Sequence, residues 1–463
     1  MARGKKKESA LTPDEKLAQA LVPDWEQPYK VPRNWCWVRL GSLGYTNIGL
    51  TYKPANISAT GTIVLRSSNI QNGQMDYSDI VSVEMDIPES KMSKKGDILI
   101  CARNGSKALV GKTAIIDRDG MSYGAFMAIF RSPYNSLIYH YLNSHYFRDI
   151  IDHDVGTTTI NQITQSLIKE LPFPLPPFAE QQRIVDRIEY LFSKLDEAKE
   201  KAQSVLDSFE TRKAAILHKA FTGELTAKWR AEHDMALEGW YNTTVGDLFD
   251  VFSGKGFKEK EYSSSGVKLL RISNVTYDEL VWEDTKYLPV EYLETVPELV
   301  LRPGDIVMAL NRPITNGKLK VSIVDDQEYY ILYQRVGCLR KRDPLNSTQY
   351  LQYALLSQAF IHQVESHLQG SDQPYINLPP LKSLTISMCS EHEQMEIVRI
   401  LDSLFSKEQQ AKEAAEAVLD KIDLLKKSIL ARAFRGELGT NAPTEESALE
   451  LLKEVLEVNK CTK

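Results

Sequence analysis

The feature that most constrains the fold is an internal repeat, because the chain carries two copies of one module. Matching residues recur 213 positions apart, and this spacing stays constant through a helical segment in each half. The matched pairs include Glu180-Gln181 with Glu393-Gln394, Val205-Leu206-Asp207 with Val418-Leu419-Asp420, and Phe221 to Leu225 with Phe434 to Leu438. Self-similarity at a long period fixes the architecture before local detail does. We therefore expect a pseudo-two-fold internal repeat, shared by whatever the protein binds.

The front part of each module has diverged more than its helical part. Leu65 to Ile70 corresponds to Leu270 to Val275 at an offset of 205, and Gly96 to Leu99 corresponds to Gly304 to Val307 at 208. The drifting offset indicates loop insertions, so the front surfaces differ while the fold is kept. Short β-rich segments are expected at 62–66, 97–101, 114–116 and 125–131, and helical segments at 137–151 and 349–366.

The helical parts, 178–222 and 390–435, carry a heptad pattern. Apolar or small residues follow alternating four–three spacing from Ile184 to Ile216 and from Ile397 to Ile429. The second pattern breaks once, at Glu408, where the first copy has Leu195. About 45 residues at 1.5 Å each would make a rod near ~65 Å long. Two seams of equal length favour an antiparallel coiled coil, and the alternative is two surface helices packed on their own domains.

Composition excludes several classes of protein. The chain has 463 residues, 43% of them hydrophobic, and no apolar run approaches the roughly 20 residues of a membrane span. No apolar stretch follows the Lys-rich start, so no signal peptide is expected. The five cysteines have no paired spacing: Cys36, Cys101, Cys338, Cys389 and Cys461. This favours a reducing cytoplasm over a disulfide framework or zinc site.

No catalytic motif is evident. The chain has no Gly-x-x-x-x-Gly-Lys-Ser/Thr loop and no His-Glu-x-x-His. The segment Phe252 to Gly256 fits the F-x-G-x-G pattern of many methyltransferases, but a Gly-rich turn after a strand explains it as well. The sequence Asn377-Leu378-Pro379-Pro380 only approximates the partner motif of adenine methyltransferases, because Leu378 intervenes.

Polar residues suited to reading base edges recur in both front parts. Arg can fork onto guanine, Asn can pair with adenine, and Ser can reach either a base or a phosphate. Glycine and small hydroxyls let the backbone approach phosphate closely. The candidate DNA-binding residues of the first copy are Tyr52, Lys53, Arg66, Ser67, Ser68, Asn69, Arg103, Asn104, Ser106, Lys107, Lys112, Thr157 and Thr158. Those of the second copy are Lys255, Lys258, Arg271, Ser273, Asn274, Asn311, Arg312, Arg335, Ser371 and Gln373.

The net charge of −6 is unusual for a DNA-binding protein that acts alone. If this chain contacts DNA, its basic groups must lie on one face, or a partner must supply much of the phosphate contact.

Taken together, these motifs resemble the specificity subunit of type I restriction-modification systems over nearly the whole chain. The specific pieces are the Pro-Leu-Pro-Pro connector leading into Glu180-Gln181-Gln182, and the paired segments Ala220 to Leu225 and Ala433 to Leu438. One departure is that the second connector, Leu384 to Cys389, has no Pro-Pro before Ser390. That departure raises a question about the rigidity of the second junction.

The resemblance implies an α+β fold in which two mixed α/β target-recognition domains alternate with two long conserved helices. The expected organisation is an N-terminal leader (1–33), target-recognition domain 1 (34–170), connector and helix 1 (171–230), target-recognition domain 2 (231–385), helix 2 (386–438) and a C-terminal tail (439–463). A short helix is expected in the leader, from Asp14 to Leu21.

The resemblance also implies a function without chemistry in this chain. Each target-recognition domain would read one half of a split, asymmetric site in double-stranded DNA, and the coiled coil would set the gap. Two modification subunits would dock on the helices, and restriction subunits would join through them. The cofactors S-adenosylmethionine, ATP and Mg²⁺ are expected on those partners, and no metal or cofactor on this chain.

Two other hypotheses remain open. A free-standing methyltransferase or nuclease would need a pair of catalytic motifs. A coiled-coil scaffold that binds only proteins would show no DNA recognition that depends on Arg66 or Arg271.

Overall fold

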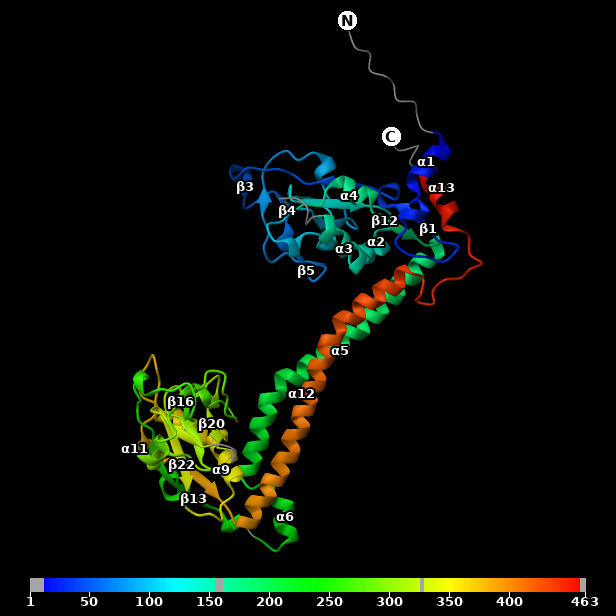
Figure 1. Ribbon diagram of the computed structural model, residues 1–463. Helices are drawn as coiled ribbons and strands as arrows, with labels where there is room; N and C mark the ends of the chain where they lie inside the picture. The colour runs from blue at the N-terminus through cyan, green and yellow to red at the C-terminus, as the bar shows by residue number, and fades with distance from the viewer. Residues whose placement is uncertain (1–11, 155–160, 236, 278, 325–328, 459–463) are drawn as a thin grey trace. The chain divides into compact units, whose positions relative to one another are not determined.

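The computed structural model describes residues 12–154, 161–235, 237–277, 279–324 and 329–458, which form two compact units (Figure 1). Unit 1 comprises residues 1–201 and 417–463, and unit 2 comprises residues 202–416. Each unit joins an α/β front part to portions of two long helices. The α+β class and the internal repeat are thus confirmed.

Unit 1 is built on two four-stranded sheets and a two-stranded connector. One sheet is antiparallel throughout, in the order β2 (Tyr45–Ile48), β11 (Met127–Arg131), β8 (Ile98–Cys101) and β9 (Thr113–Ile115). The other has the order β10 (Ser122–Tyr123), β4 (Thr62–Leu65), β7 (Ser82–Val83) and β3 (Ile57–Ser58), with β10 and β4 parallel. The connector pairs β1 (Cys36–Arg39) with β12 (Pro172–Leu175).

Unit 2 repeats this plan. Its antiparallel sheet has the order β14 (Phe249–Ser253), β22 (Val336–Lys341), β17 (Ile306–Ala309) and β20 (Val321–Ile323). A three-stranded sheet follows the order β16 (Lys286–Leu288), β15 (Val267–Leu270) and β21 (Tyr330–Leu332). The connector pairs β13 (Tyr241–Thr244) with β23 (Thr385–Met388), so the connector without Pro-Pro forms the same kind of strand pair as the first. A hairpin of β18 (Ile314–Thr315) and β19 (Lys318–Leu319) is added after β17.

Helices follow the antiparallel sheet in both units, and each expected helical segment divides in two. Unit 1 has α2 (Asn135–Leu142), α3 (His145–Asp154) and α4 (Gln165–Glu170), and unit 2 has α9 (Thr348–Leu355), α10 (Gln358–Ser366) and α11 (Leu378–Ser383). The side-chain amide of Asn143 donates to Thr113 Oγ1 where α2 ends. Ser357 caps α10 by accepting a bond from the backbone N–H of Phe360. Polar residues at these breaks therefore end one helix and begin the next.

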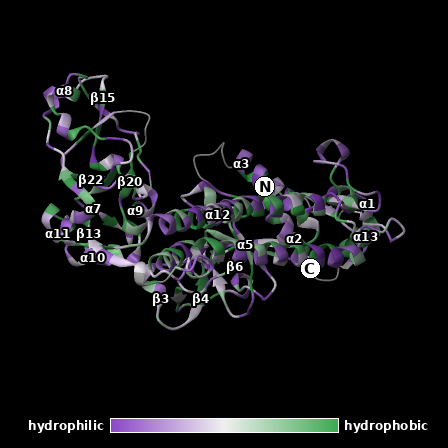
Figure 2. Cartoon of the chain, turned by 90° about the horizontal axis from the view of Figure 1, so that it is seen from below, coloured by the Kyte–Doolittle hydropathy of each residue, from purple (hydrophilic) through white to green (hydrophobic). Residues whose placement is uncertain are grey.

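The long helices α5 (Phe178–Phe221) and α12 (Glu391–Phe434) each have 44 residues, close to the predicted bounds. Hydrophobic and hydrophilic residues alternate along both (Figure 2). In unit 1, Lys426 Nζ lies 2.6 Å from Asp196 Oδ1, and in unit 2, Arg212 NH2 lies 2.8 Å from Glu408 Oε2. Each ion pair therefore joins the two long helices within its unit. The ion pair with Arg212 also accounts for Glu408, the one polar break in the second heptad pattern.

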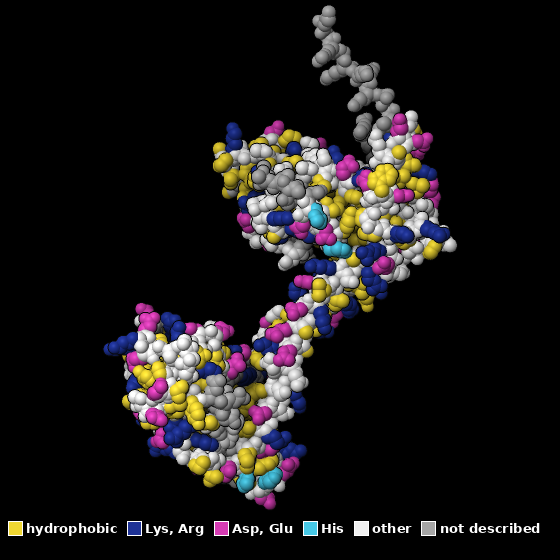
Figure 3. Space-filling view, in the orientation of Figure 1, with side chains coloured by type: hydrophobic (Ala, Val, Ile, Leu, Met, Phe, Trp, Pro, Cys, Tyr) yellow, Lys and Arg dark blue, Asp and Glu magenta, His cyan; other side chains and the backbone are white. Residues whose placement is uncertain are grey.

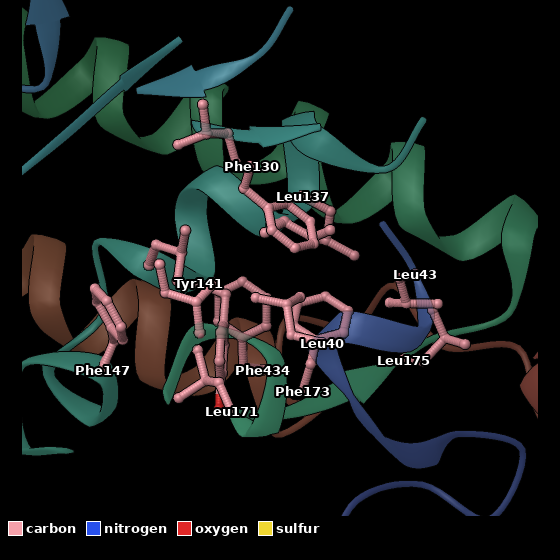
Figure 4. Close-up of a cluster of buried hydrophobic side chains, with 14 of the residues drawn as sticks. Leu40, Leu43, Phe130, Leu137, Tyr141, Phe147, Leu171, Phe173, Leu175 and Phe434 are labelled. Carbon is pink, nitrogen blue, oxygen red and sulfur yellow. The ribbon is translucent and has the colours of Figure 1, made fainter. Parts of the chain in front are cut away.

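The core of unit 1 takes in residues from both ends of the chain (Figure 4). The ring of Phe434, at the end of α12, lies 5.0 Å from that of Tyr141 in a T-shaped arrangement. Beside this core, α1 (Pro13–Ala20) packs on α13 (Ala448–Val458), and Leu17 contributes to the cluster that contains Ala448 and Leu452. The segments expected as leader and tail thus both contribute helices to unit 1.

A buried glutamate joins the front part of each unit to a long helix. In unit 1, Glu180 accepts from Trp35 Nε1 (2.7 Å), Thr440 Oγ1 (3.0 Å) and Asn441 Nδ2 (2.8 Å). Glu393 of unit 2 has an equivalent set, made of Trp240 Nε1 (3.0 Å), Thr226 Oγ1 (2.6 Å) and Arg230 NH1 (2.5 Å). The donors Thr440 and Thr226 follow α12 and α5, so each glutamate is completed by the end of the opposite helix.

Candidate nucleic-acid interface

The candidate site begins with a turn that directly follows β4 in unit 1 and β15 in unit 2. Asn69 is buried, and its Oδ1 accepts from the backbone N–H of Arg66 (2.8 Å). Its Nδ2 donates to the carbonyls of Asp76 and Asp79, both at 2.9 Å. Asn274 makes the corresponding bonds to the backbone of Arg271 and Val281 in unit 2.

This geometry corrects the prediction that Asn69 and Asn274 read bases directly. Both side chains are at most 2% exposed, and their amides are used within the turn. A buried amide that is hydrogen-bonded within its own loop is not presented at the protein surface, where DNA would lie. Their role is to fix the turns that carry Arg66 and Arg271.

Each of these arginines pairs with an aspartate 13 residues further along the chain. Arg66 NH2 lies 2.8 Å from Asp79 Oδ2, and Arg271 NH2 lies 2.8 Å from Asp284 Oδ2. The pKa of Asp284 is lowered, chiefly by its hydrogen bond with Arg271. Within the described part of the chain, the Nε of both arginines is buried without a hydrogen-bond partner. Each guanidinium is therefore held at one nitrogen and has donors to spare.

In unit 1 the turn opens on a cleft of about 1260 Å³. Six of the predicted residues line it, namely Tyr52, Arg66, Ser67, Ser68, Arg103 and Asn104. Asn104 Nδ2 donates to Ser67 Oγ at 3.2 Å, which joins the loop after β8 to the turn after β4. The backbone of Arg103 forms a bridge with Gln162, so a third segment closes the cleft. The fold thus brings together loops that lie far apart in the sequence.

Unit 2 brings the matching segments together through the same backbone contacts. Asn311 bridges to Tyr375, as Arg103 bridges to Gln162, and Arg312 donates its N–H to the Pro374 carbonyl at 2.6 Å. The N–H of Leu310 donates to the carbonyl of Arg335 at 2.9 Å. Arg335 and the segment 310–312 are therefore neighbours.

The remaining predicted residues lie around these loops or away from them. Lys53 is exposed beside the cleft residues Tyr52 and Pro54, and Ser106 is exposed one residue beyond Gly105. Lys255, Lys258, Ser273, Ser371 and Gln373 are exposed in unit 2. Lys107 Nζ instead donates to the Asp152 carbonyl of α3 at 3.0 Å, and half-buried Lys112 does not line the cleft. Thr157 and Thr158 lie outside the described residues.

The sequence pattern missed Phe126, a large apolar side chain in the cleft. Phe126 is 58% exposed, and the guanidinium carbon of Arg103 lies 5.1 Å from the centre of its ring. The expected strand at 125–131 placed Phe126 inside a sheet. In the structure the strand starts at Met127, and Ala125 and Phe126 form a turn before it. Phe126 is recognised by its solvent exposure in the structure. The periodic pattern of apolar residues in the sequence does not predict that exposure.

The F-x-G-x-G segment has a structural explanation. A Cβ at Gly254 would collide with the carbonyl oxygen of Leu332, so glycine lets the chain after β14 approach the end of β21 closely. Across the residues that the structure describes, no cluster of three or more His, Cys, Asp or Glu could hold a metal ion. No described helix is long and apolar enough to cross a bilayer.

Charge is mixed on the visible surface of each unit. Lys and Arg side chains are interspersed with Asp and Glu on the face in view (Figure 3).

A protein-family model matches the chain twice. The model of the type I restriction modification DNA specificity domain matches residues 32–206 and again residues 237–417. The two matches cover most of both front parts and much of both long helices.

Individual relatives agree with this match. The chain is 34% identical over 275 residues to the type I restriction enzyme MjaVIII specificity subunit of Methanocaldococcus jannaschii, covering 57% of this chain and 63% of that protein. It is 27% identical over 429 residues to the EcoKI specificity subunit of Escherichia coli, covering 88% of this chain and 90% of the other.

Solved structures share the fold. The HsdS subunit from Thermoanaerobacter tengcongensis aligns with a TM-score of 0.61 at 21% identity, covering 89% of this chain and 99% of that one. A chain from a structural study of assembly and conformational transition in the type I R-M system aligns with a TM-score of 0.63 at 19% identity, covering 89% and 100%.

Proposed function

Because the chain belongs to the type I restriction-modification DNA specificity family, we propose that it reads a split DNA site for a modification complex. Each unit recognises one half of the site in double-stranded DNA. The two half-sites differ, because the two front parts differ in sequence. The chain itself carries out no bond-making step.

The observation that carries the proposal is the duplication of one loop arrangement with polar side chains at matching places. Arg66 and Arg271 occupy the same turn and pair with Asp79 and Asp284 in the same way. Arginine held at one nitrogen is suited to bidentate contact with a base edge or a phosphate. The cleft of about 1260 Å³ in unit 1 gives such contacts a concave surface.

We further propose that α5 and α12 form an antiparallel coiled coil that sets the gap between the half-sites. Each helix continues from one unit into the other, and 44 residues correspond to about 66 Å at 1.5 Å per residue. The opposed ion pairs Lys426–Asp196 and Arg212–Glu408 support the pairing of the helices within each unit.

The helices also supply docking surfaces for partner proteins. Both helices carry exposed apolar side chains, with Phe178 at 70% and Tyr190 at 53% on α5, and Met395 at 51% and Leu424 at 64% on α12. Exposed apolar side chains of this size suit a protein interface. We propose that two modification subunits bind here and that restriction subunits join through them. In this cytoplasmic assembly, S-adenosylmethionine, ATP and Mg²⁺ belong to the partner subunits.

We propose that the modification subunits methylate adenine at N6. The test is therefore to map N6-methyladenine across the genome of the source strain with and without this gene. The proposal expects one motif with two unlike halves to lose its methylation when the gene is deleted. The proposal is wrong if the parent strain expresses the gene and every methylated motif is still methylated after the gene is deleted.

A further inference from the structure

Phe126 of unit 1 and Arg335 of unit 2 occupy the same backbone position. Each is the third residue of a four-residue turn, Gly124–Met127 or Tyr333–Val336, that leads into the central strand β11 or β22. The N–H of Met127 donates to the carbonyl of Gly124 at 2.8 Å in unit 1, and the N–H of Val336 donates to the carbonyl of Tyr333 at 3.4 Å in unit 2.

The surroundings of the two turns also correspond. The N–H of Gly124 donates to Leu65 at 2.9 Å, and that of Tyr333 donates to Leu270 at 3.0 Å. The turns thus adjoin the residues that precede Arg66 and Arg271.

The carbonyls of the two third residues are held alike. That of Phe126 accepts from Ala102 at 3.0 Å, and that of Arg335 accepts from Leu310 at 2.9 Å. These contacts place the backbone of both residues beside the loops that carry Arg103 and Asn311.

The two side chains differ completely in chemistry. Phe126 is apolar and 58% exposed in the cleft. Arg335 is exposed, and its side chain makes no hydrogen bond or ion pair with any described residue. Its φ of 68° is a conformation that a residue with a side chain rarely adopts. Such conformations cost free energy and are concentrated at ligand sites and tight turns.

This contrast separates common from specific contacts. The Arg–Asp pairs are the same in both units, so they suit a feature that both half-sites share. A position that keeps its place in the turn and changes its side-chain chemistry suits the base pair that distinguishes the two half-sites.

Resting on the proposed function, we infer that Phe126 and Arg335 are the residues that distinguish the half-sites. Phe126 makes apolar contact with a thymine methyl group, and Arg335 forks onto the O6 and N7 acceptors of a guanine. Both contacts are available at base edges in the major groove.

The test compares Phe126→Ala and Arg335→Ala in the full chain, expressed with its partner subunits, by genome-wide mapping of N6-methyladenine. Phe126→Ala should lower discrimination about tenfold at one A·T pair of one half-site. Arg335→Ala should do the same at one G·C pair of the other half-site. Every other position of the motif should keep its wild-type preference.

Two matched controls remove the same chemistry elsewhere. Trp25→Ala removes an aromatic side chain of unit 1 that is 84% exposed and does not line the cleft. Arg342→Ala removes the arginine that directly follows β22, whereas Arg335 directly precedes it. Neither control should alter the motif.

Three results would overturn the assignment: a motif unchanged in both variants, a change in the same half-site for both, or relaxation at the opposite class of base pair. If Phe126→Ala silences methylation, Phe126→Asn, which also removes the apolar contact, takes its place in the test, and an unchanged motif in that variant also counts against the assignment. Deleting the gene in the same experiment tests the proposed function separately, because that test depends on loss of the whole motif.

Discussion

Trp35 donates its indole N–H to Glu180 at 2.7 Å, and this bond ties the first residues of the front part of unit 1 to the first turn of α5. Glu180 is fully buried and also accepts from Thr440 and Asn441. One carboxylate therefore holds three segments of the chain together. Glu393 and Trp240 repeat the relationship in unit 2.

Replacing Glu180 with Ala should destabilise unit 1 by about 3 kcal/mol, because buried donors lose their acceptor. Hydrogen exchange should rise in peptides around Trp35 and Thr440 while peptides of unit 2 keep their protection. Glu180→Gln, which retains one carbonyl oxygen, should cost less. The control is Glu189→Ala, at an exposed position of the same helix. Equal exchange in Glu180→Ala and the control would contradict this account.

The buried pair of Asp97 and Arg131 makes a second stability prediction. Asp97 is 2% exposed, and its carboxylate accepts from Arg131 Nε at 2.6 Å and NH2 at 2.5 Å. Asp97→Asn should cost about 3 kcal/mol, since it leaves a partly buried guanidinium without its counter-charge. Exchange of the β8 and β11 amides measures the loss. Glu197→Gln on the exposed part of α5 removes the same charge and should have almost no effect.

His140 should make unit 1 sensitive to mild acid. Burial lowers its pKa from 6.5 to about 4. Between these values the unfolded chain binds the proton and the folded unit does not. Stability should therefore fall as the pH drops from 6.5 to 4, by about 3 kcal/mol at most.

The comparison protein for this prediction is His140→Phe, which keeps a ring against Phe192 and cannot titrate. Thermal unfolding of unit 1 should lose part of its dependence on pH between 4 and 6.5 in this variant. An identical pH profile in the two proteins would show that His140 is not the group responsible.

Removing Arg66 or Arg271 should affect one half-site only. A contact with phosphate would weaken binding about equally for all sequences and lower the slope of log K against log salt by about one. A contact with a base would relax the motif at one position. Binding at several salt concentrations, together with methylation mapping of Arg66→Ala and Arg271→Ala, separates these outcomes. If neither variant changes binding or the motif, the scaffold hypothesis gains support.

The length of the long helices should set the gap between half-sites. Deleting seven residues from α5 and the matching seven from α12 shortens both by about 10.5 Å, or about 3 base pairs of DNA. The methylated motif should then have a shorter gap and unchanged halves. Substituting seven exposed residues without deletion controls for loss of side chains. A constant gap in the shortened protein would refute the ruler.

The repeat and the bounds of its helices could be predicted because they depend on the spacing of residues along the chain. The heptad spacing predicted 178–222 and 390–435, and the helices run from Phe178 to Phe221 and from Glu391 to Phe434. The strand at Ile98–Cys101 was expected for the same reason, since a buried strand is a short apolar run.

The candidate site could be predicted only in part. Arg66 and Arg103 follow strands, and strand ends can be read from sequence. Asn69 was expected at a ligand and lies inside its own turn, because only the folded loop decides which way an amide points. Phe126 was missed because Ala125 and Phe126 are apolar like the strand β11 that follows them. The sequence pattern therefore does not mark where the turn ends and the strand begins.

The sequence by itself determined two related modules, two long helices and the absence of the catalytic motifs sought. These follow from spacing, which is a property of the chain alone. Only the tertiary structure decided that Glu180 is completed by residues beyond α12 and that Phe126 and Arg335 share one place. Such relationships depend on contacts between residues far apart in sequence, and packing, not local preference, selects them.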